Sequence, residues 1–547
     1  MDQIVAQSPD ATDHARQDAF DTRVRHFRES LLWPVRLAEH GGGVRGLVAS
    51  LLKPGSPWKI HNDEFDDPVE FRERHYHELV TFLPPVRRFL YGEGAGAGAT
   101  GSIATEVLRR TDVARVRVTL AGATTAVTLD VAHVDLYIFA DVDLAMLNLE
   151  VTADNVPLRT AQDVMYQFGR LYPCKWADDG APADCPARVE WLSDDGRVLA
   201  VSDYEERAKY LKFVCLNRTP LVASHWEFLI RPLTQFVSGA RDDQQYKLLE
   251  GDRLPLMAFV GTLNSNSLTR GDYVRLAFAG ASGDSTCLPF AERHLEHFEA
   301  DYCYDRHDER RGGGEPITLR FMSSETAFVV AGRWEDEGFA CPERGYLGQF
   351  RHQQFLLFMI AHFQKAALLM FSDRLAGAVK ELDISDPKAI LAFRGALRLE
   401  LERFLRFTHR YWFYSVSSNE LDRELFALSR RHLGLDRLFE DVRAEIEEMS
   451  QFLETEALRR QNDSMMRLTV VTIFGLIWTI VTGFLGMNIF DYTALSPLQK
   501  TGAFLVVLAP TIALMMIAVR SSRRLSAYLD RLSDGLSNGK LKGRRRT

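Results

Sequence analysis

Neutral oxygen donors stand at regular spacing near the C-terminal end of the chain. Thr472 and Thr479 are seven residues apart, and Asn488 closes the tripeptide Gly486-Met487-Asn488. Amide and hydroxyl oxygens can accept hydrogen bonds from water. These side chains could therefore line a narrow polar path with neutral oxygen atoms.

The spacing also predicts one stripe on a helix, because positions seven apart share a face. Small, hydroxyl-bearing and flexible apolar side chains make up this stripe. Its members are Met465, Thr469, Thr472, Leu476, Thr479, Gly483 and Gly486. Helix packing uses the same small residues, so the stripe alone leaves both a cation path and a packing surface open.

Two uncharged runs must position these side chains. Residues 468–490 carry no charge over 23 positions, and a second uncharged run covers residues 501–519. About 20 apolar residues cross a bilayer as a helix. We therefore expect two transmembrane helices, residues 468–488 and 501–519, joined by an extracytoplasmic loop, residues 489–500.

The flanking charges predict the orientation of this hairpin. Arg459, Arg460 and Arg467 precede the first run, a basic tail of residues 520–547 follows the second, and residues 489–499 contain no Lys or Arg. The positive-inside rule places both termini in the cytoplasm. We expect a multi-pass protein of the cytoplasmic (inner) membrane, with roughly 465 residues on the cytoplasmic side and a tail attracted to anionic lipid head groups.

The composition limits the classes of protein to which the chain can belong. The chain has 547 residues, 46% of them hydrophobic, which is ample for a packed core. Its net charge of −8 gives no basic footprint for nucleic acid. The six cysteines are scattered and expected in a reducing compartment, which argues against disulfides. Cys174 and Cys185 leave a metal-closed loop as a minor alternative.

The fold class that we expect is an α+β membrane protein with a mixed α/β cytoplasmic domain. Residues 1–104 are expected to form a helical extension with a Gly/Ala linker, and residues 105–344 the α/β domain, with "YVRLAFAG" (273–280) among its strands. Residues 345–434 predict two long cytoplasmic helices broken near 383–387. Residues 435–467 predict a stalk helix, starting after Gly434 and running on into the first span.

An apolar seam marks the start of this stalk. Its positions alternate in steps of four and three, as in a coiled coil. They are Leu435, Phe439, Val442, Ile446, Met449 and Leu453.

A long cytoplasmic helix, "GMN" at the outer end of the first of two C-terminal spans, and a basic tail resemble the CorA-type divalent metal ion transporters. The resemblance covers residues 435–530 best. It implies a funnel-shaped homopentamer in the lipid bilayer, with the first spans around a central pore. It also implies a selectivity filter of Gly486, Met487 and Asn488, and pore-lining side chains along the stripe. The transported cation is expected to be Mg²⁺, with no prosthetic group and no enzyme activity.

Two departures from the family's usual sequence leave a second transport function as an alternative. Leu485 stands where the family usually has an aromatic residue, and the loop "IFDYTALSPLQ" lacks the acidic pattern of typical magnesium members. A ZntB-like, proton-coupled Zn²⁺ transporter remains an alternative. The N-terminal half is outside the resemblance, so a non-transporting, membrane-anchored oligomeric binding module is a third reading.

Cation sensing in such proteins is expected from carboxylates between subunits. The candidates are Glu440, Asp441, Glu445, Glu447 and Glu448 on the stalk and Asp383 and Asp386 at the helical break. A second cluster of residues that could bind a metal ion lies within fourteen consecutive positions. It comprises His294, His297, Glu299, Asp301, Cys303, Asp305 and His307. For both sets an ordinary solvated surface is the competing interpretation.

Overall fold

The computed structural model describes residues 22–37, 43–61, 73–92, 105–237, 245–263, 268–304, 319–380, 382–383, 386–487, 496–498, 501–502, 504–513 and 516. The chain divides into two compact units, Met1–Ile446 and Glu447–Thr547. The two units are described separately below.

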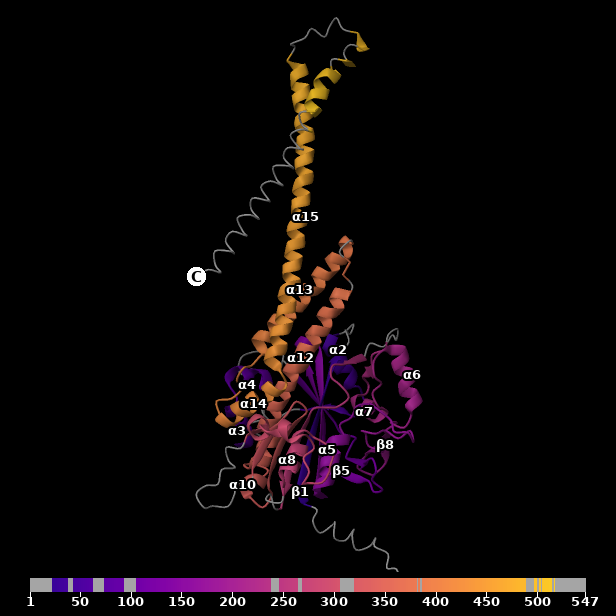
Figure 1. Ribbon diagram of the computed structural model, residues 1–547, viewed down its shortest axis with the longest axis vertical. Coiled ribbons are helices and arrows are strands. Elements are labelled where there is room, and N and C mark those ends of the chain that lie inside the picture. The colour runs from indigo at the N-terminus through magenta and orange to yellow at the C-terminus, as the bar shows by residue number, and fades with distance from the viewer. Residues whose placement is uncertain are drawn as a thin grey trace, which may run out of the picture. The chain divides into compact units, whose positions relative to one another are not determined.

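The first unit is built on one large, mostly antiparallel sheet (Figure 1). Its centre runs β14 (Ala327–Arg333), β11 (Leu256–Thr262), β1 (Arg23–Leu37), β6 (Leu144–Pro157) and β5 (Val127–Phe139). The other described strands are β2 (Trp58–Ile60), β3 (Thr105–Arg110), β4 (Arg115–Thr119), β7 (Arg188–Leu192), β8 (Val198–Val201), β9 (Thr234–Gln235), β10 (Gln245–Leu248), β12 (Cys303–Tyr304) and β13 (Arg320–Ser323). β11 and β14 pair in parallel, while β1 is antiparallel to β6, β10 and β11.

Strand β1 corrects the expected helical extension. Its residues occupy the middle of the sheet, where Arg28 pairs with Thr152 of β6 and Phe259 of β11. The boundary at residue 104 therefore does not separate a domain, because the sheet begins 80 residues earlier. The partners of β1 lie more than 100 residues away in the chain, so local periodicity could not reveal this pairing.

Helices cover both faces of the sheet. Leu31, Trp33 and Val35 of β1 belong to the main core together with α5 (Leu158–Gln167), α7 (Ser224–Ile230) and α8 (Arg270–Ala277). Leu32 lies between them in the strand and points to the opposite face, where α12 (Phe355–Lys380) contacts β1 and β6. The remaining short elements are α2 (Gly43–Leu51), α3 (Glu73–Thr81), α4 (Pro84–Tyr91), α6 (Arg207–Asn217), α9 (Phe298–Tyr302), α10 (Glu337–Ala340), α11 (Tyr346–Gln349), the π-helical η5 (Phe350–Gln354) and the 3-10 turns η2 (Ala140–Val142) and η4 (Glu292–Leu295).

Helix α8 corrects a second expectation, the strand at residues 273–280. Thr269 and Asp272 form a reciprocal capping box that begins this helix. A capping box satisfies two backbone donors that a helix start otherwise leaves free. This local signal outweighs the β-type composition of "YVRLAFAG".

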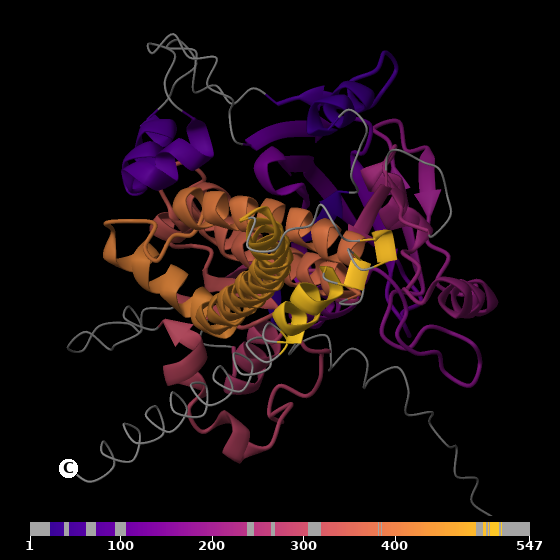
Figure 2. The ribbon, with the colours of Figure 1, turned by 90° about the horizontal axis from the view of Figure 1, so that it is seen from above.

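The two long helices predicted after residue 345 are confirmed. Helix α12 ends at Lys380, and α13 (Pro387–Arg410) begins with the Asp386 side chain accepting a hydrogen bond from the Lys388 backbone N–H. They pack beside each other and, with α14 (Glu420–His432), form one helical group (Figure 2). Gly434 follows at φ 63°, the left-handed conformation that ends helices, and α15 (Leu435–Gly486) starts at the next residue.

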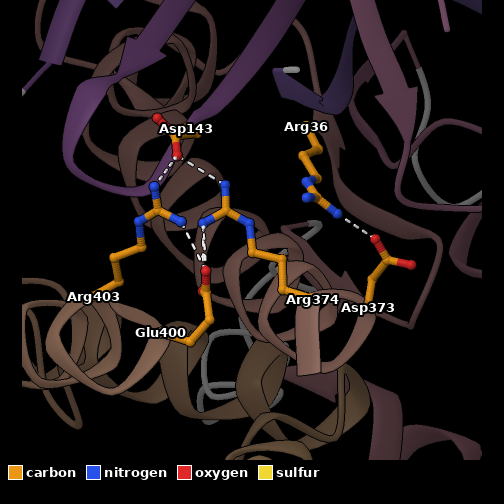
Figure 3. Close-up of polar contacts among 6 residues, drawn as sticks. All are labelled: Arg36, Asp143, Asp373, Arg374, Glu400 and Arg403. Carbon is orange, nitrogen blue, oxygen red and sulfur yellow. Dashed lines mark hydrogen bonds and ion pairs between the residues drawn. The ribbon is translucent and has the colours of Figure 1, made fainter. Parts of the chain in front are cut away.

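An ionic network joins this helix pair to the sheet (Figure 3). Arg374 of α12 donates to Asp143 at 2.8 Å and lies 3.4 Å from Glu400 of α13. Arg403 contacts the same two carboxylates, at 3.2 Å and 2.8 Å. Asp143 lies just before β6, so two arginines and two carboxylates fasten α12 and α13 to the sheet. Arg36 of β1 adds an ion pair to Asp373.

Only one helix among the described residues is long and apolar enough to cross a bilayer, and it runs over Tyr346–Lys380. Of its most apolar stretch, 78% is buried inside the first unit. Gln354, His362, Gln364 and Arg374 are buried along it, which identifies a core helix of the α/β unit. Shorter apolar helices occur at Val471–Gly483 and Phe504–Ala513.

Candidate functional site

Four of the six predicted seam positions on α15 are buried, and the last two, Met449 and Leu453, are half-buried. Leu435, Phe439, Val442 and Ile446 are at most 6% exposed. The Phe439 ring stacks on Trp412 at 4.3 Å between centroids. These contacts explain why the helix begins where it does, because its first apolar face completes the packing of the first unit.

In the second unit, α15 buries a narrow face. Ile477 is 6% exposed and Val481 is fully buried. On the same side, Trp478 contacts Phe504 of the short apolar helix Phe504–Ala513, with ring centroids 6.4 Å apart. This face therefore packs against the second apolar segment of the chain.

The stripe predicted from the sequence lies on another side of α15. At about 100° per residue, Thr472 and Thr479 are roughly 140–160° around the helix from Ile477. Both threonines are exposed, as are Met465 and Leu476 at 60% and 55%. Thr469, Gly483 and Gly486 are exposed as well. Within the single chain, the described residues therefore bury a different face of α15 from the one that carries the stripe.

The threonine hydroxyls along the stripe have a shared geometry. Thr469, Thr472 and Thr479 each donate a hydrogen bond to the carbonyl four residues earlier, at 2.8–2.9 Å. Such back-bonding uses the hydroxyl hydrogen and satisfies it within the helix. The oxygen lone pairs that remain can accept hydrogen bonds from water, including water of a hydrated cation.

The expected filter lies at the limit of the described residues. Gly486 is the last residue of α15, and Met487 follows in a turn with 67% exposure. Asn488, Asp491 and the expected loop lie outside the described residues. The described helix thus ends two residues before the predicted boundary at 488, and the role of Asn488 stays a prediction.

The candidate sensing carboxylates on α15 are exposed and belong to surface ion pairs or a solvated face. Asp441 is 3.8 Å from Arg437, and Glu440 is 3.8 Å from Arg443. Glu445, Glu447 and Glu448 are exposed. At the helical break, Asp386 caps α13. Within the described part of the chain, no three His, Cys, Asp or Glu side chains are arranged to hold a metal ion.

Residues of the alternative metal clusters also have other partners. In the histidine-rich cluster, Glu299 pairs with Arg270 at 2.6 Å, and the Asp301 carbonyl is 2.8 Å from His432 Nε2. Asp305 and His307 lie outside the described residues. None of the six cysteines forms a disulfide among the described residues. Burial, with hydrogen bonding to Asp252, raises the pKa of Cys174 to about 11, and burial also raises the pKa of Cys185, which disfavours the thiolates that zinc needs.

Comparison with known proteins finds a family that matches the C-terminal region. Residues 403–521, about a fifth of the chain, match the family described as CorA-like Mg2+ transporter protein. This stretch covers the end of α13, α14, all of α15 and the second apolar segment. The region is thus of the class of divalent-cation transporters of membranes. Within that class the matched region is of the CorA type, which confirms the resemblance read from its sequence.

Two further comparisons complete this result. A search of curated protein sequences finds no match. Among solved structures, the CorA magnesium transporter from Methanocaldococcus jannaschii is similar at 13% identity, with a TM-score of 0.17, over 50% of this chain and 92% of that one. That TM-score is too low to support any argument about the fold.

Proposed function

We propose that the chain forms a homopentameric channel that conducts divalent cations, with Mg²⁺ as the transported ion. Five copies of α15 would surround a central pore, and the hairpin of residues 468–488 and 501–519 would span the bilayer with both termini in the cytoplasm. The observation that carries this proposal is the stripe on α15. It is exposed in the single chain, bears hydroxyl oxygens, and ends at Gly486 beside Met487 and Asn488.

The stripe divides the pore into two kinds of surface. Thr472 and Thr479 would present oxygen lone pairs to the hydration shell of the passing ion. Leu476 lies between them and Met465 lies seven residues before Thr472, and these two side chains would form apolar rings that empty of water when the pore is narrow. A dewetted apolar constriction blocks ions without a physical plug. The ring of Asn488 side chains would select hydrated cations at the outer mouth.

Ion flux into liposomes that contain the purified full-length protein tests this function. Mg²⁺ entry that is independent of a pH gradient and lost in Asn488→Ala supports the magnesium channel. Zn²⁺ entry stimulated by a proton gradient would assign the protein to the ZntB-like alternative, which Leu485 and the loop sequence motivate. If neither ion enters the liposomes while the oligomers remain intact, the result would favour the third alternative, the membrane-anchored binding module.

The hydroxyl stripe has a matched control in the second apolar helix. Thr479→Val removes one oxygen per subunit from the proposed pore at nearly constant volume. Thr511 makes the same back-bond to a carbonyl, that of Val507, at 2.7 Å, so Thr511→Val removes an equivalent group elsewhere. We expect Thr479→Val to reduce Mg²⁺ flux several-fold and Thr511→Val to leave it near wild type. Equal effects of the two variants would contradict the pore-lining assignment.

A further inference from the structure

The first unit contains a polar cavity that the proposed channel function does not use. It has a volume of about 270 Å³ and lies between strands β3, β5 and β6 and the elements α3 and η5. Arginine and histidine side chains dominate its lining, among them Arg74, Arg109, Arg351, His75, His133 and His352. Two neighbouring hollows of about 390 Å³ and 260 Å³ share Arg74 and His352 with it. The first cavity by itself is large enough for a ligand bigger than a single ion.

The two carboxylates on the sheet side of this cavity are already engaged by cations. Arg109 holds Asp135 through two hydrogen bonds of 2.7 Å and 2.8 Å. Glu150 lies 2.9 Å from His133 Nε2 and also pairs with Arg28. Burial alone would raise the pKa of Glu150. Hydrogen bonding and charge from His133 and Arg28 more than offset this, so its pKa lies well below the ordinary range.

The third carboxylate, Glu78, is engaged as well. It accepts a 2.6 Å hydrogen bond from the Tyr91 hydroxyl and lies 3.5 Å from His352 Nδ1. Oxygens that already neutralise neighbouring cations are poor ligands for an added metal ion. The described lining residues include no set of three arranged to hold one. A cation is therefore not the occupant that this cavity favours.

Arg351 has two other arginines, Arg28 and Arg74, among its charged neighbours. Its nearest carboxylate oxygen, on Glu150, is 3.9 Å away, and that carboxylate already pairs with Arg28 and His133. Burial and the charge of Arg28 lower the pKa of Arg351, and Arg74 lowers it further against the opposing effect of Glu150. Like charges gathered in a partly buried space are relieved by an anion placed among them.

The backbone around Arg351 is unusual in a way that fits a binding site. Arg351 and His352 belong to η5, a π-helical turn that leads into α12. Such wide turns are rare and occur frequently at functional sites. One wall of the cavity is aromatic, because Tyr137 and Phe355 line it with ring centroids 6.1 Å apart. The cavity thus combines a fork-shaped phosphate donor with a surface suited to a flat organic group.

We propose that this cavity binds a phosphate-bearing anion of nucleotide size, with Arg351 contacting the phosphate and Tyr137 and Phe355 contacting the organic part. The proposal concerns a ligand site of the sheet-based unit and does not rest on ion conduction. Its failure and that of the channel would be seen in separate experiments.

Titration calorimetry on the purified full-length protein in detergent tests this site. The probes are AMP, ATP, pyrophosphate and inorganic phosphate, each at constant ionic strength with EDTA, so that metal–phosphate complexes are excluded. We expect saturable binding of a nucleotide with one site per chain, weakened at least tenfold by Arg351→Gln. Binding of inorganic phosphate as tight as that of the nucleotides would support phosphate recognition and identify free phosphate as the source.

The matched control is Arg406→Gln, which removes the same charge from an exposed pair with Glu402 on α13. It should bind as the wild type does. If Arg351→Gln lowers the melting temperature, Arg351→Lys is used in its place. This variant keeps the positive charge but loses the fork-shaped guanidinium, and it should still weaken nucleotide binding several-fold. The proposal is overturned if none of the four probes binds at millimolar concentration, or if the Arg351 variants bind as tightly as the control.

Discussion

At the scale of single residues, burial changes the ionisation of a carboxyl group in this chain. Glu29 of β1 is fully buried, and neither carboxylate oxygen has a hydrogen-bond partner among the described residues. Burial raises the pKa of Glu29 from 4.5 to about 8, against the opposing charge of Arg253. A carboxyl group in such a place is neutral at pH 7.

This shift predicts a stability difference that depends on pH. Between pH 4.5 and 8 the folded state retains a proton that the unfolded state has lost, so stability falls as pH rises through this window. Glu29→Gln removes this titration, and we expect it to be close to wild type near pH 4.5 and more stable by about 1–3 kcal/mol at pH 8. Urea denaturation of detergent-solubilised protein, followed by tryptophan fluorescence, measures this. A variant with no gain at pH 8 would show that Glu29 ionises normally.

The ionic network of Figure 3 gives a second prediction at this scale. The side chain of Arg374 is only 4% exposed and depends on Asp143 and Glu400 for compensation. Glu400→Ala leaves this buried charge with one partner and should cost about 3 kcal/mol.

The matched control for this prediction lies on the same helix. Glu402 is exposed and pairs with Arg406 across one turn at 2.6 Å, so Glu402→Ala should cost less than about 0.5 kcal/mol. Urea midpoints of the two variants provide the comparison. Similar losses in both would mean that the network does not fasten α13 to the sheet.

At the scale of elements, one glycine separates α14 from α15. Gly434 adopts φ 63°, which costs an L-residue roughly 1 kcal/mol. Gly377 lies exposed inside α12, and a Cβ added there would meet nothing within 4 Å. We expect Gly434→Ala to destabilise by about 1 kcal/mol and Gly377→Ala to stabilise by roughly 0.5–1 kcal/mol. Thermal melting of both variants checks the opposite signs, and a neutral Gly434→Ala would contradict the role of this residue as a helix stop.

The exposed stripe of α15 gives a prediction for the same element. Leu476 is 55% exposed in the single chain, and in the proposed pore it would contribute to an apolar constriction. Leu476→Ser would wet this constriction, so we expect basal Mg²⁺ flux to rise several-fold. Fluorescent Mg²⁺ uptake into liposomes measures it. Unchanged flux with intact assembly would place the gate elsewhere.

At the scale of the whole molecule, the CorA-type region occupies residues 403–521, and its first part, up to Ile446, belongs to the sheet-based unit. The proposed channel requires several copies of α15 around one axis. The mass of the detergent-solubilised oligomer tests this, with five chains expected. A monomer or dimer would remove the central pore from the proposal, while the anion site in the first unit would still stand.

The sequence by itself determined the C-terminal region, because local signals suffice there. Uncharged runs, the "GMN" tripeptide, the heptad stripe and Gly434 all act through neighbouring residues. The continuous helix from Leu435 and the CorA-type match confirm the helix start after Gly434 and the resemblance, and the roles of the stripe and of "GMN" stay predictions. The break between α12 and α13 was likewise predicted, since Asp386 and Pro387 cap a helix locally.

Only the tertiary structure decided the rest of the first unit. Strand β1 pairs with partners more than 100 residues away, and the polar cavity gathers side chains from α3, β3, β5, β6 and η5. The single residues Arg351, Glu150 and Arg109 carry no motif, and His133 and Glu150 meet only because β5 pairs with β6. Long-range strand pairing brings distant charges together and buries them, and no local pattern records where that burial will occur.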